Sequence, residues 1–60
     1  MPVTANEMQN YLAGAMYPAE GPELAVRAER NGAPPEVVER IREMPSMDGA
    51  DAVLARIPQD

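Results

Sequence analysis

The sequence predicts an all-α protein, a small bundle of four short helices with a helix-turn-helix-like corner between the second and third helices. Apolar residues recur at helical spacing, and Gly and Pro punctuate the chain at short intervals. No segment alternates apolar and polar residues for long enough to form a strand. Sixty residues suffice for one domain, so residues 1–60 are expected to form a single unit with a thin core.

The first helix is expected from about Ala5 to Ala13. Thr4 and Glu7 have the spacing of a capping box, in which each side chain accepts a hydrogen bond from the backbone N–H of the other residue. Met8 and Leu12 are expected to face inward. Gly14 is expected to end the helix, because glycine readily adopts the conformation found just beyond a helix C-terminus.

The second helix is expected to begin at Pro22, since proline suits the first helical position, and to run to Arg30. Leu24 lies on its inward face. Asn31 and Gly32 end the helix, because Gly32 is free to take the left-handed conformation of a C-terminal cap.

The third helix begins at Pro34 or one residue later, because Pro35 forces Pro34 toward extended backbone angles. It has the strongest helical periodicity in the chain and is expected to end before Pro45. Its apolar positions are Val37, Val38, Ile41 and Met44. Glu36 and Arg40, four residues apart, are expected to support it as an ion pair.

The fourth helix is expected to be capped by Asp48 and to end at Pro58. Val53, Leu54 and Ile57 are its predicted buried residues.

The side-chain chemistry disfavours catalysis. The chain has no histidine, cysteine or lysine, so bases and nucleophiles would have to come from carboxylates, tyrosines or Ser46. Asp48 and Asp51 lack the further spaced oxygen ligands of a calcium loop. We therefore expect no enzymatic activity, no cofactor and no metal.

Ten acidic residues against five arginines give a net charge of −5. This charge repels nucleic acid at long range. The absence of a long apolar run and of a basic, apolar leader predicts no membrane span and a cytoplasmic location. Basicity from arginine alone, together with abundant alanine and proline, suggests a bacterial source with a GC-rich genome.

Several short motifs occur in a characteristic order: Tyr17-Pro18-Ala19, Asn31-Gly32-Ala33-Pro34 and Met44-Pro45. Their order and spacing resemble the bacterial family known as Domain of Unknown Function 2795, over roughly residues 7 to 57. The resemblance implies a small helical fold and assigns no catalytic or binding residue. Where the family often has a serine cap for the second helix, this chain has Glu20-Gly21-Pro22. A glycine is therefore expected to take the place of the serine as the cap.

The corner also resembles that of DNA-binding helix-turn-helix proteins. Ala28 is small enough to let the two helices pack closely, and Gly32 can adopt the conformation of the turn. Val38 and Ile41 are expected to pack over the contact between the helices. Any tight corner between two helices needs these residue types. A helix-turn-helix nucleic-acid binder, or an accessory to one, is nevertheless the alternative function.

Charge on the third helix argues against that alternative. Glu36, Glu39 and Glu43 form an acidic face at helical spacing, whereas a recognition helix presents basic and amide side chains. Such a stripe is usually a solvated face. It could instead dock a basic partner surface. The net charge of −5 alone suggests a third possibility, an acidic decoy of nucleic acid.

The remaining candidate surface is apolar and comprises Met16, Tyr17, Met44 and Met47. Methionine adapts to varied partners, and so short a chain is not expected to bury all of its methionines. The simpler interpretation, which the residue types favour, packs Tyr11, Met16 and Tyr17 in the core, with each hydroxyl reaching the surface. We expect a non-catalytic interaction or regulatory module whose partner is a protein, either a second copy or another chain.

Overall fold

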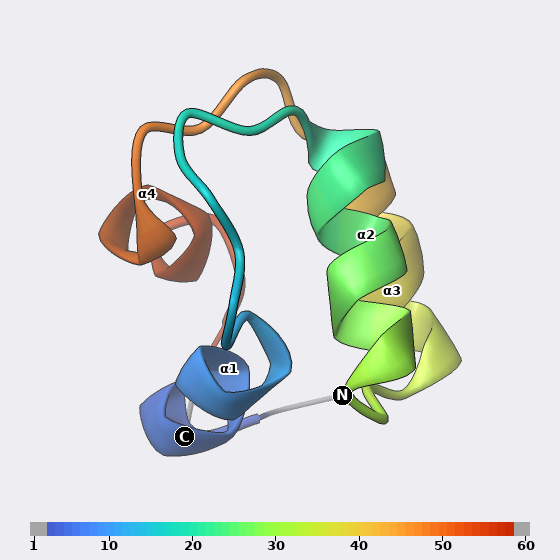
Figure 1. Cartoon of the computed structure of the whole chain (residues 1–60). Helices are drawn as coiled ribbons and strands as arrows, with labels where there is room; N and C mark the ends of the chain where they lie inside the picture. Colours follow the sequence, from blue (N-terminus) through green and yellow to red (C-terminus); the bar gives the residue numbers. More distant parts are fainter. Residues whose placement is uncertain (1–2, 59–60) are drawn as a thin grey trace.

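The computed structural model describes residues 3–58, and over that range the chain is all-α, as predicted. Its helices are α1 (Ala5–Tyr11), α2 (Gly21–Arg30), α3 (Pro35–Arg42) and α4 (Ala50–Leu54). α2 and α3 pack together on one side, α1 and α4 lie on the other, and two long connectors cross at one end of the molecule (Figure 1). No helix within the described range is long and apolar enough to cross a membrane.

The start of α1 is the predicted capping box. The Thr4 backbone N–H donates to Glu7 Oε1 at 2.9 Å, and the Glu7 N–H donates to Thr4 Oγ1 at 3.1 Å. The helix ends at Tyr11, two residues earlier than expected, and a turn follows. Leu12 is the C-cap, so Gly14 does not itself stop the helix as predicted, but it lies in this turn with a left-handed φ of +85°.

α2 begins one residue earlier than predicted. Glu20 occupies the N-cap, and its backbone N–H donates to Glu23 Oε1 at 3.3 Å. Gly21 is therefore the first helical residue, and close packing rather than capping explains the glycine. A Cβ placed there would lie 2.6 Å from the carbonyl oxygen of Ile41 and closer still to that of Met44.

The corner after α2 forms as predicted. Gly32 has φ +93°, its N–H donates to the Glu29 carbonyl at 3.1 Å, and the Ala33 N–H donates to the Ala28 carbonyl at 2.9 Å. These two bonds are those of a Schellman motif, which satisfies the last carbonyls of the helix. Pro34 is extended, with ψ 152°, so α3 starts at Pro35.

Beyond this corner, α2 and α3 form an antiparallel pair. The corner joins the end of α2 to the start of α3, while Gly21, at the start of α2, contacts the backbone of Ile41 and Met44 at the end of α3. Small buried residues, Gly21, Ala25 and Ala28, line α2 along this contact. In a DNA-binding helix-turn-helix the two helices cross at about 90–120°, whereas here one lies along the other.

Asn31, the C-cap of α2, also ties the helix pair to α1. Its side-chain Nδ2 donates to the carbonyl oxygens of Tyr11 at 2.8 Å and Ala13 at 3.1 Å. The first carbonyl belongs to the last residue of α1 and the second to the turn that follows, where the helix leaves its acceptors without intrahelical partners. One amide therefore joins the C-terminal ends of two helices.

α3 ends at Arg42, earlier than its apolar pattern suggested, with Glu43 as its C-cap. The predicted ion pair between Glu36 and Arg40 does not form. Arg42 Nη1 instead donates to Glu39 Oε2 at 2.6 Å. Both spacings place partners on neighbouring turns of a helix, so sequence spacing alone could not select between them.

The prediction that Asp48 caps the last helix is wrong. The N-cap of α4 is Gly49, which makes no side-chain capping bond, and the helix ends at Leu54, well before Pro58. Gly49 is still extended, with φ −177° and ψ 171°, so the helix begins only at Ala50, one residue later than an Asp48 cap requires. Just before it, Met47 and Ala19 exchange two backbone hydrogen bonds, of 3.0 and 2.7 Å.

The core draws on all four helices and both connectors. Its buried members are Val3, Met8, Leu12, Ala19, Leu24, Ala25, Ala28, Val37, Val38, Ile41, Met44, Met47, Val53 and Ile57. The predicted inward residues of the first and third helices are confirmed. In the fourth helix region Val53 and Ile57 are buried, while Leu54 is only partly so.

Candidate interaction surface

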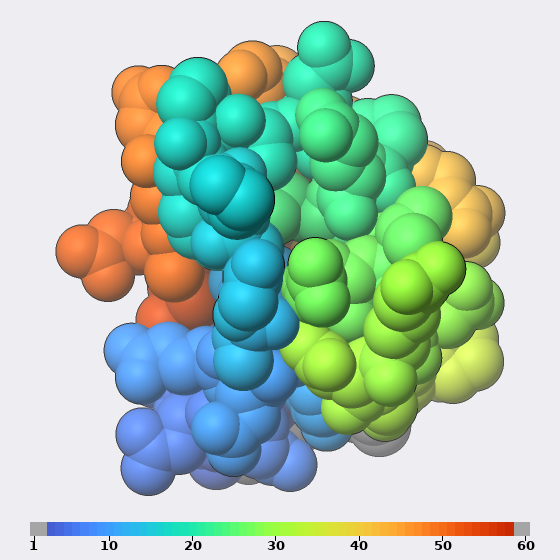
Figure 2. Space-filling model, in the orientation of Figure 1, coloured from blue at the N-terminus to red at the C-terminus, as the bar shows by residue number. Residues whose placement is uncertain are grey.

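Met16 is the most exposed large apolar residue among those described, with 85% of its surface accessible. It lies on the connector between α1 and α2, which crosses the front face of the molecule (Figure 2). Its neighbours Ala15 and Tyr17 are partly buried against the core. The connector is therefore anchored on both sides of a methionine that points into solvent.

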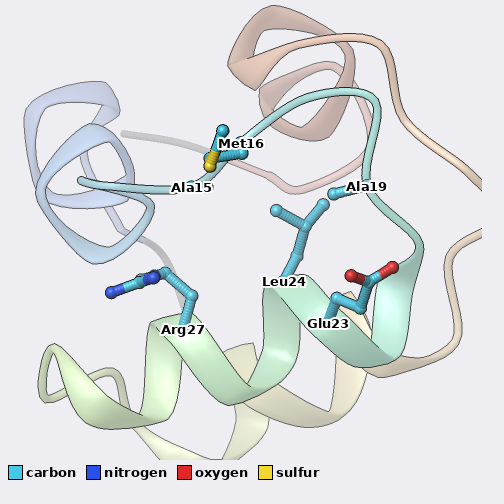
Figure 3. Close-up of a pocket in the computed structure, with 6 residues that line it drawn as sticks. All are labelled: Ala15, Met16, Ala19, Glu23, Leu24 and Arg27. Atoms are coloured by element: carbon cyan, nitrogen blue, oxygen red, sulfur yellow. The ribbon is translucent and has the colours of Figure 1, made fainter.

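An open hollow of about 230 Å³ lies beside Met16, between the connector and α2. Its lining residues, which we call the Met16 surface, are Ala15, Met16, Ala19, Glu23, Leu24 and Arg27. Leu24 rises from α2 toward the connector, and Glu23 and Arg27 leave the helix on either side of it and point apart (Figure 3). The hollow therefore combines apolar groups with one charge of each sign.

Helical spacing explains how α2 supplies these residues. Glu23 and Arg27 are four positions apart and share one side of the helix, while Leu24 is turned further toward the core. The Arg27 guanidinium lies near the turn after α1, 3.5 Å from where a Cβ on Gly14 would be. Neither Glu23 nor Arg27 has an ion-pair partner in the part of the chain that the structure describes.

Tyr17 turns its polar end inward. Its hydroxyl oxygen is buried and has no hydrogen-bond partner among residues 3–58. Burial raises the pKa of this phenol above its ordinary value. The expectation that the hydroxyl would reach the surface is therefore wrong, and only part of the ring is accessible.

Met44 and Met47, the other two residues of the predicted apolar surface, are not exposed. They retain only 8% and 3% of their accessible surface, so the expectation that they would be available to a partner is wrong. Met44 follows Ile41 by three residues and continues the buried stripe of α3. Met47 is held inward by its backbone bonds to Ala19.

The acidic face of α3 is solvated, as its spacing suggests. Glu36, Glu39 and Glu43 are all exposed, and Glu39 is paired with Arg42, both side chains remaining half or more accessible. Within the described residues, no three acidic side chains are arranged to hold a metal ion.

The model of a family described as Protein of unknown function (DUF2795) matches residues 3–58. The chain belongs to this family. A search of curated proteins and a search of solved structures found no match.

The motifs that indicated DUF2795 have structural roles in this chain. Ala19, of Tyr17-Pro18-Ala19, bonds to Met47, and the Tyr17-Pro18 peptide bond is cis. Gly32 caps α2, and Met44 is in the core. Met16, Glu23 and Arg27 lie outside these motifs. The sequence signal that could have predicted the hollow is the spacing of Glu23 and Arg27 around Leu24.

Proposed function

We propose that this DUF2795 protein is a non-catalytic interaction module that binds a protein partner through the Met16 surface. The observation that carries the proposal is an 85% exposed methionine at the mouth of a hollow with an apolar floor. Methionine is flexible and polarisable, so it packs well against partner surfaces of varied shape. Of the predicted apolar surface, Met16 and part of Tyr17 are accessible for such a contact.

The chemistry of the described side chains also favours binding over catalysis. General bases and nucleophiles are usually recognised by shifted pKa values in a cleft that substrate can enter. The raised pKa found here belongs to Tyr17, whose hydroxyl is buried away from solvent. The hollow beside Met16 offers a carboxylate and a guanidinium that point apart, an arrangement suited to recognition.

Site-specific photo-cross-linking tests the proposal. A photoreactive amino acid replaces Met16 in one variant and Val26 in another, each within the full chain. Val26 is the matched control, because it is also an exposed apolar residue of this region, 52% accessible, but does not line the hollow. Irradiation in lysate of the cells that make the protein should give a discrete adduct from position 16 and none from position 26.

A substitution provides the second measurement. Met16→Glu should remove the partner from affinity-captured protein, while Val26→Glu should retain it, because only the former places a charge at the hollow. Equal adducts from both positions, or none from position 16, would contradict the proposal.

A further inference from the structure

We infer that the partner of the Met16 surface is a second copy of this chain, bound around a two-fold axis. The inference rests on the proposed function, since it uses the same surface. In a two-fold dimer the same patch occurs on both sides, so the patch must be complementary to itself. The Met16 surface meets this requirement in both shape and charge.

Shape is self-complementary because the patch contains both a projecting side chain and a hollow. Met16 projects at the mouth, and Leu24 lies beneath it (Figure 3). A volume of about 230 Å³ holds several waters, each of which takes about 30 Å³, so it can accept an unbranched methionine side chain. A two-fold axis beside the hollow lets Met16 of each copy enter the hollow of the other.

Charge is self-complementary because Glu23 and Arg27 lie on either side of Leu24 on α2. When two copies of α2 pair in antiparallel fashion about the axis, Glu23 of each copy meets Arg27 of the other. Two ion pairs result. Within one chain neither of these side chains has an ion-pair partner among the described residues, so no such pair has to be broken.

The size of the protein limits the strength of this association. A stable interface buries about 800 Å² on each partner, which is about a fifth of the 3739 Å² that one chain exposes. Net charges of −5 on both copies also repel. We therefore expect a weak dimer, with a Kd at the micromolar end of the range for interfaces of this size.

Sedimentation equilibrium over micromolar to millimolar concentrations measures this association. The wild-type mass should rise from 6.5 kDa toward twice that value as the concentration increases. Met16→Glu should stay monomeric, and Val26→Glu, which adds the same charge outside the hollow, should behave like the wild type.

Charge exchange tests the two-fold geometry directly. Glu23→Arg sets cation against cation, Arg27→Glu sets anion against anion, and each should weaken dimerisation about tenfold. The double variant Glu23→Arg/Arg27→Glu should restore it, and an equimolar mixture of the two single variants should form a heterodimer. Glu29→Arg is the matched control, because it makes the same charge change on α2 at a residue outside the Met16 surface.

Circular dichroism checks that each variant folds. This control is needed because the Glu23 carboxylate also accepts a hydrogen bond from the Glu20 N–H at the start of α2. Failure of the mixed single variants to associate, or an equal effect of Glu29→Arg, would overturn the two-fold arrangement. If the chain stays monomeric while position 16 cross-links a different protein, the dimer is overturned and the proposed function is retained. A dimer that is insensitive to Met16→Glu, with no adduct from position 16, overturns both the dimer and the proposed function.

Discussion

At Gly21 the backbone of α2 meets the last turn of α3 with no space for a side chain. The atoms that a Cβ would approach are the carbonyl oxygens of Ile41 and Met44 and the amide nitrogen of Met44, all of them backbone. Backbone atoms cannot move aside as the end of a flexible side chain can. The glycine is therefore required by packing, while its φ lies in the ordinary helical range.

Gly21→Ala should lower the free energy of unfolding by about 3 kcal/mol, at the upper end of the cost of overpacking. Urea denaturation followed by circular dichroism measures the change. Gly49→Ala is the matched control, because nothing lies within 4 Å of its added Cβ and its backbone is extended. Equal destabilisation of the two variants would show that Gly21 does not mark a close contact.

A second residue-scale prediction concerns the buried hydroxyl of Tyr17, which finds no hydrogen-bond partner within the described range. A buried polar group without a partner loses its hydration and gains nothing in return. Tyr17→Phe should therefore raise the free energy of unfolding at neutral pH by about 1 kcal/mol. Tyr11→Phe, which removes the other phenol, should change it by less than about 0.5 kcal/mol.

The same residue predicts loss of stability at alkaline pH. Because burial raises the pKa of Tyr17 in the folded state, the folded chain holds the phenolic proton more tightly than the unfolded chain does. Tighter proton binding stabilises the folded state. This stabilisation is fully present below the ordinary tyrosine pKa of about 10, and it is lost as pH rises through the pKa of the folded chain. Denaturation at pH 8 and pH 11 should show a smaller alkaline loss in Tyr17→Phe than in the wild type.

At the scale of the elements, Asn31 is the joint between α1 and the α2–α3 pair. Its amide donates to two carbonyls at the end of α1 while its backbone closes α2. Without this amide the carbonyls of Tyr11 and Ala13 would rely on water, whereas the last carbonyls of α2 are already bonded by the N–H groups of Gly32 and Ala33. The residue therefore couples the orientation of α1 to the end of α2.

Asn31→Ala should lower the free energy of unfolding by about 1–2 kcal/mol, because two hydrogen bonds are lost together. Asn31→Asp should cost at least as much, since its oxygens would face the carbonyls of Tyr11 and Ala13. Asn10→Ala, at another exposed asparagine, is the control and should have little effect. Thermal unfolding followed by circular dichroism compares the three variants, and indistinguishable melting curves would contradict the role of Asn31 as a joint.

At the scale of the whole molecule, charge and helix geometry act in the same direction. The net charge is −5, the outward face of α3 carries Glu36, Glu39 and Glu43, and α3 lies along α2. Phosphate contacts from basic side chains supply most of the non-specific affinity for DNA, and this face offers carboxylates. We therefore expect that the molecule does not act as a helix-turn-helix DNA reader.

Titration with mixed-sequence duplex DNA at low salt should show no binding, because electrostatic repulsion is strongest there. Fluorescence anisotropy of a labelled duplex is the measurement. Replacing Glu36, Glu39 and Glu43 together by lysine changes the net charge from −5 to +1 and should produce salt-sensitive, non-specific binding. Wild-type binding under these conditions would instead support the nucleic-acid alternative.

Much of the local structure follows from short stretches of sequence, although the end of α1 and the cap of α4 do not. The capping box of Thr4 and Glu7, the left-handed Gly32 and the start of α3 after Pro34 all follow from contacts within a few residues, so short motifs predict them. The order of the helices, the inward stripe of α3 and membership of DUF2795 could be predicted in the same way. Met16 is exposed, but the sequence also allowed it to pack in the core.

The long-range partners of these elements are visible only in the folded chain. Gly21 against the end of α3, the Asn31 amide on α1 and the pairing of Ala19 with Met47 each join residues 18 or more positions apart. The burial of Met47 and the hollow beside Met16 depend on how the connectors cross and pack. No local pattern records those contacts, because their free energy exists only once the separate elements have come together.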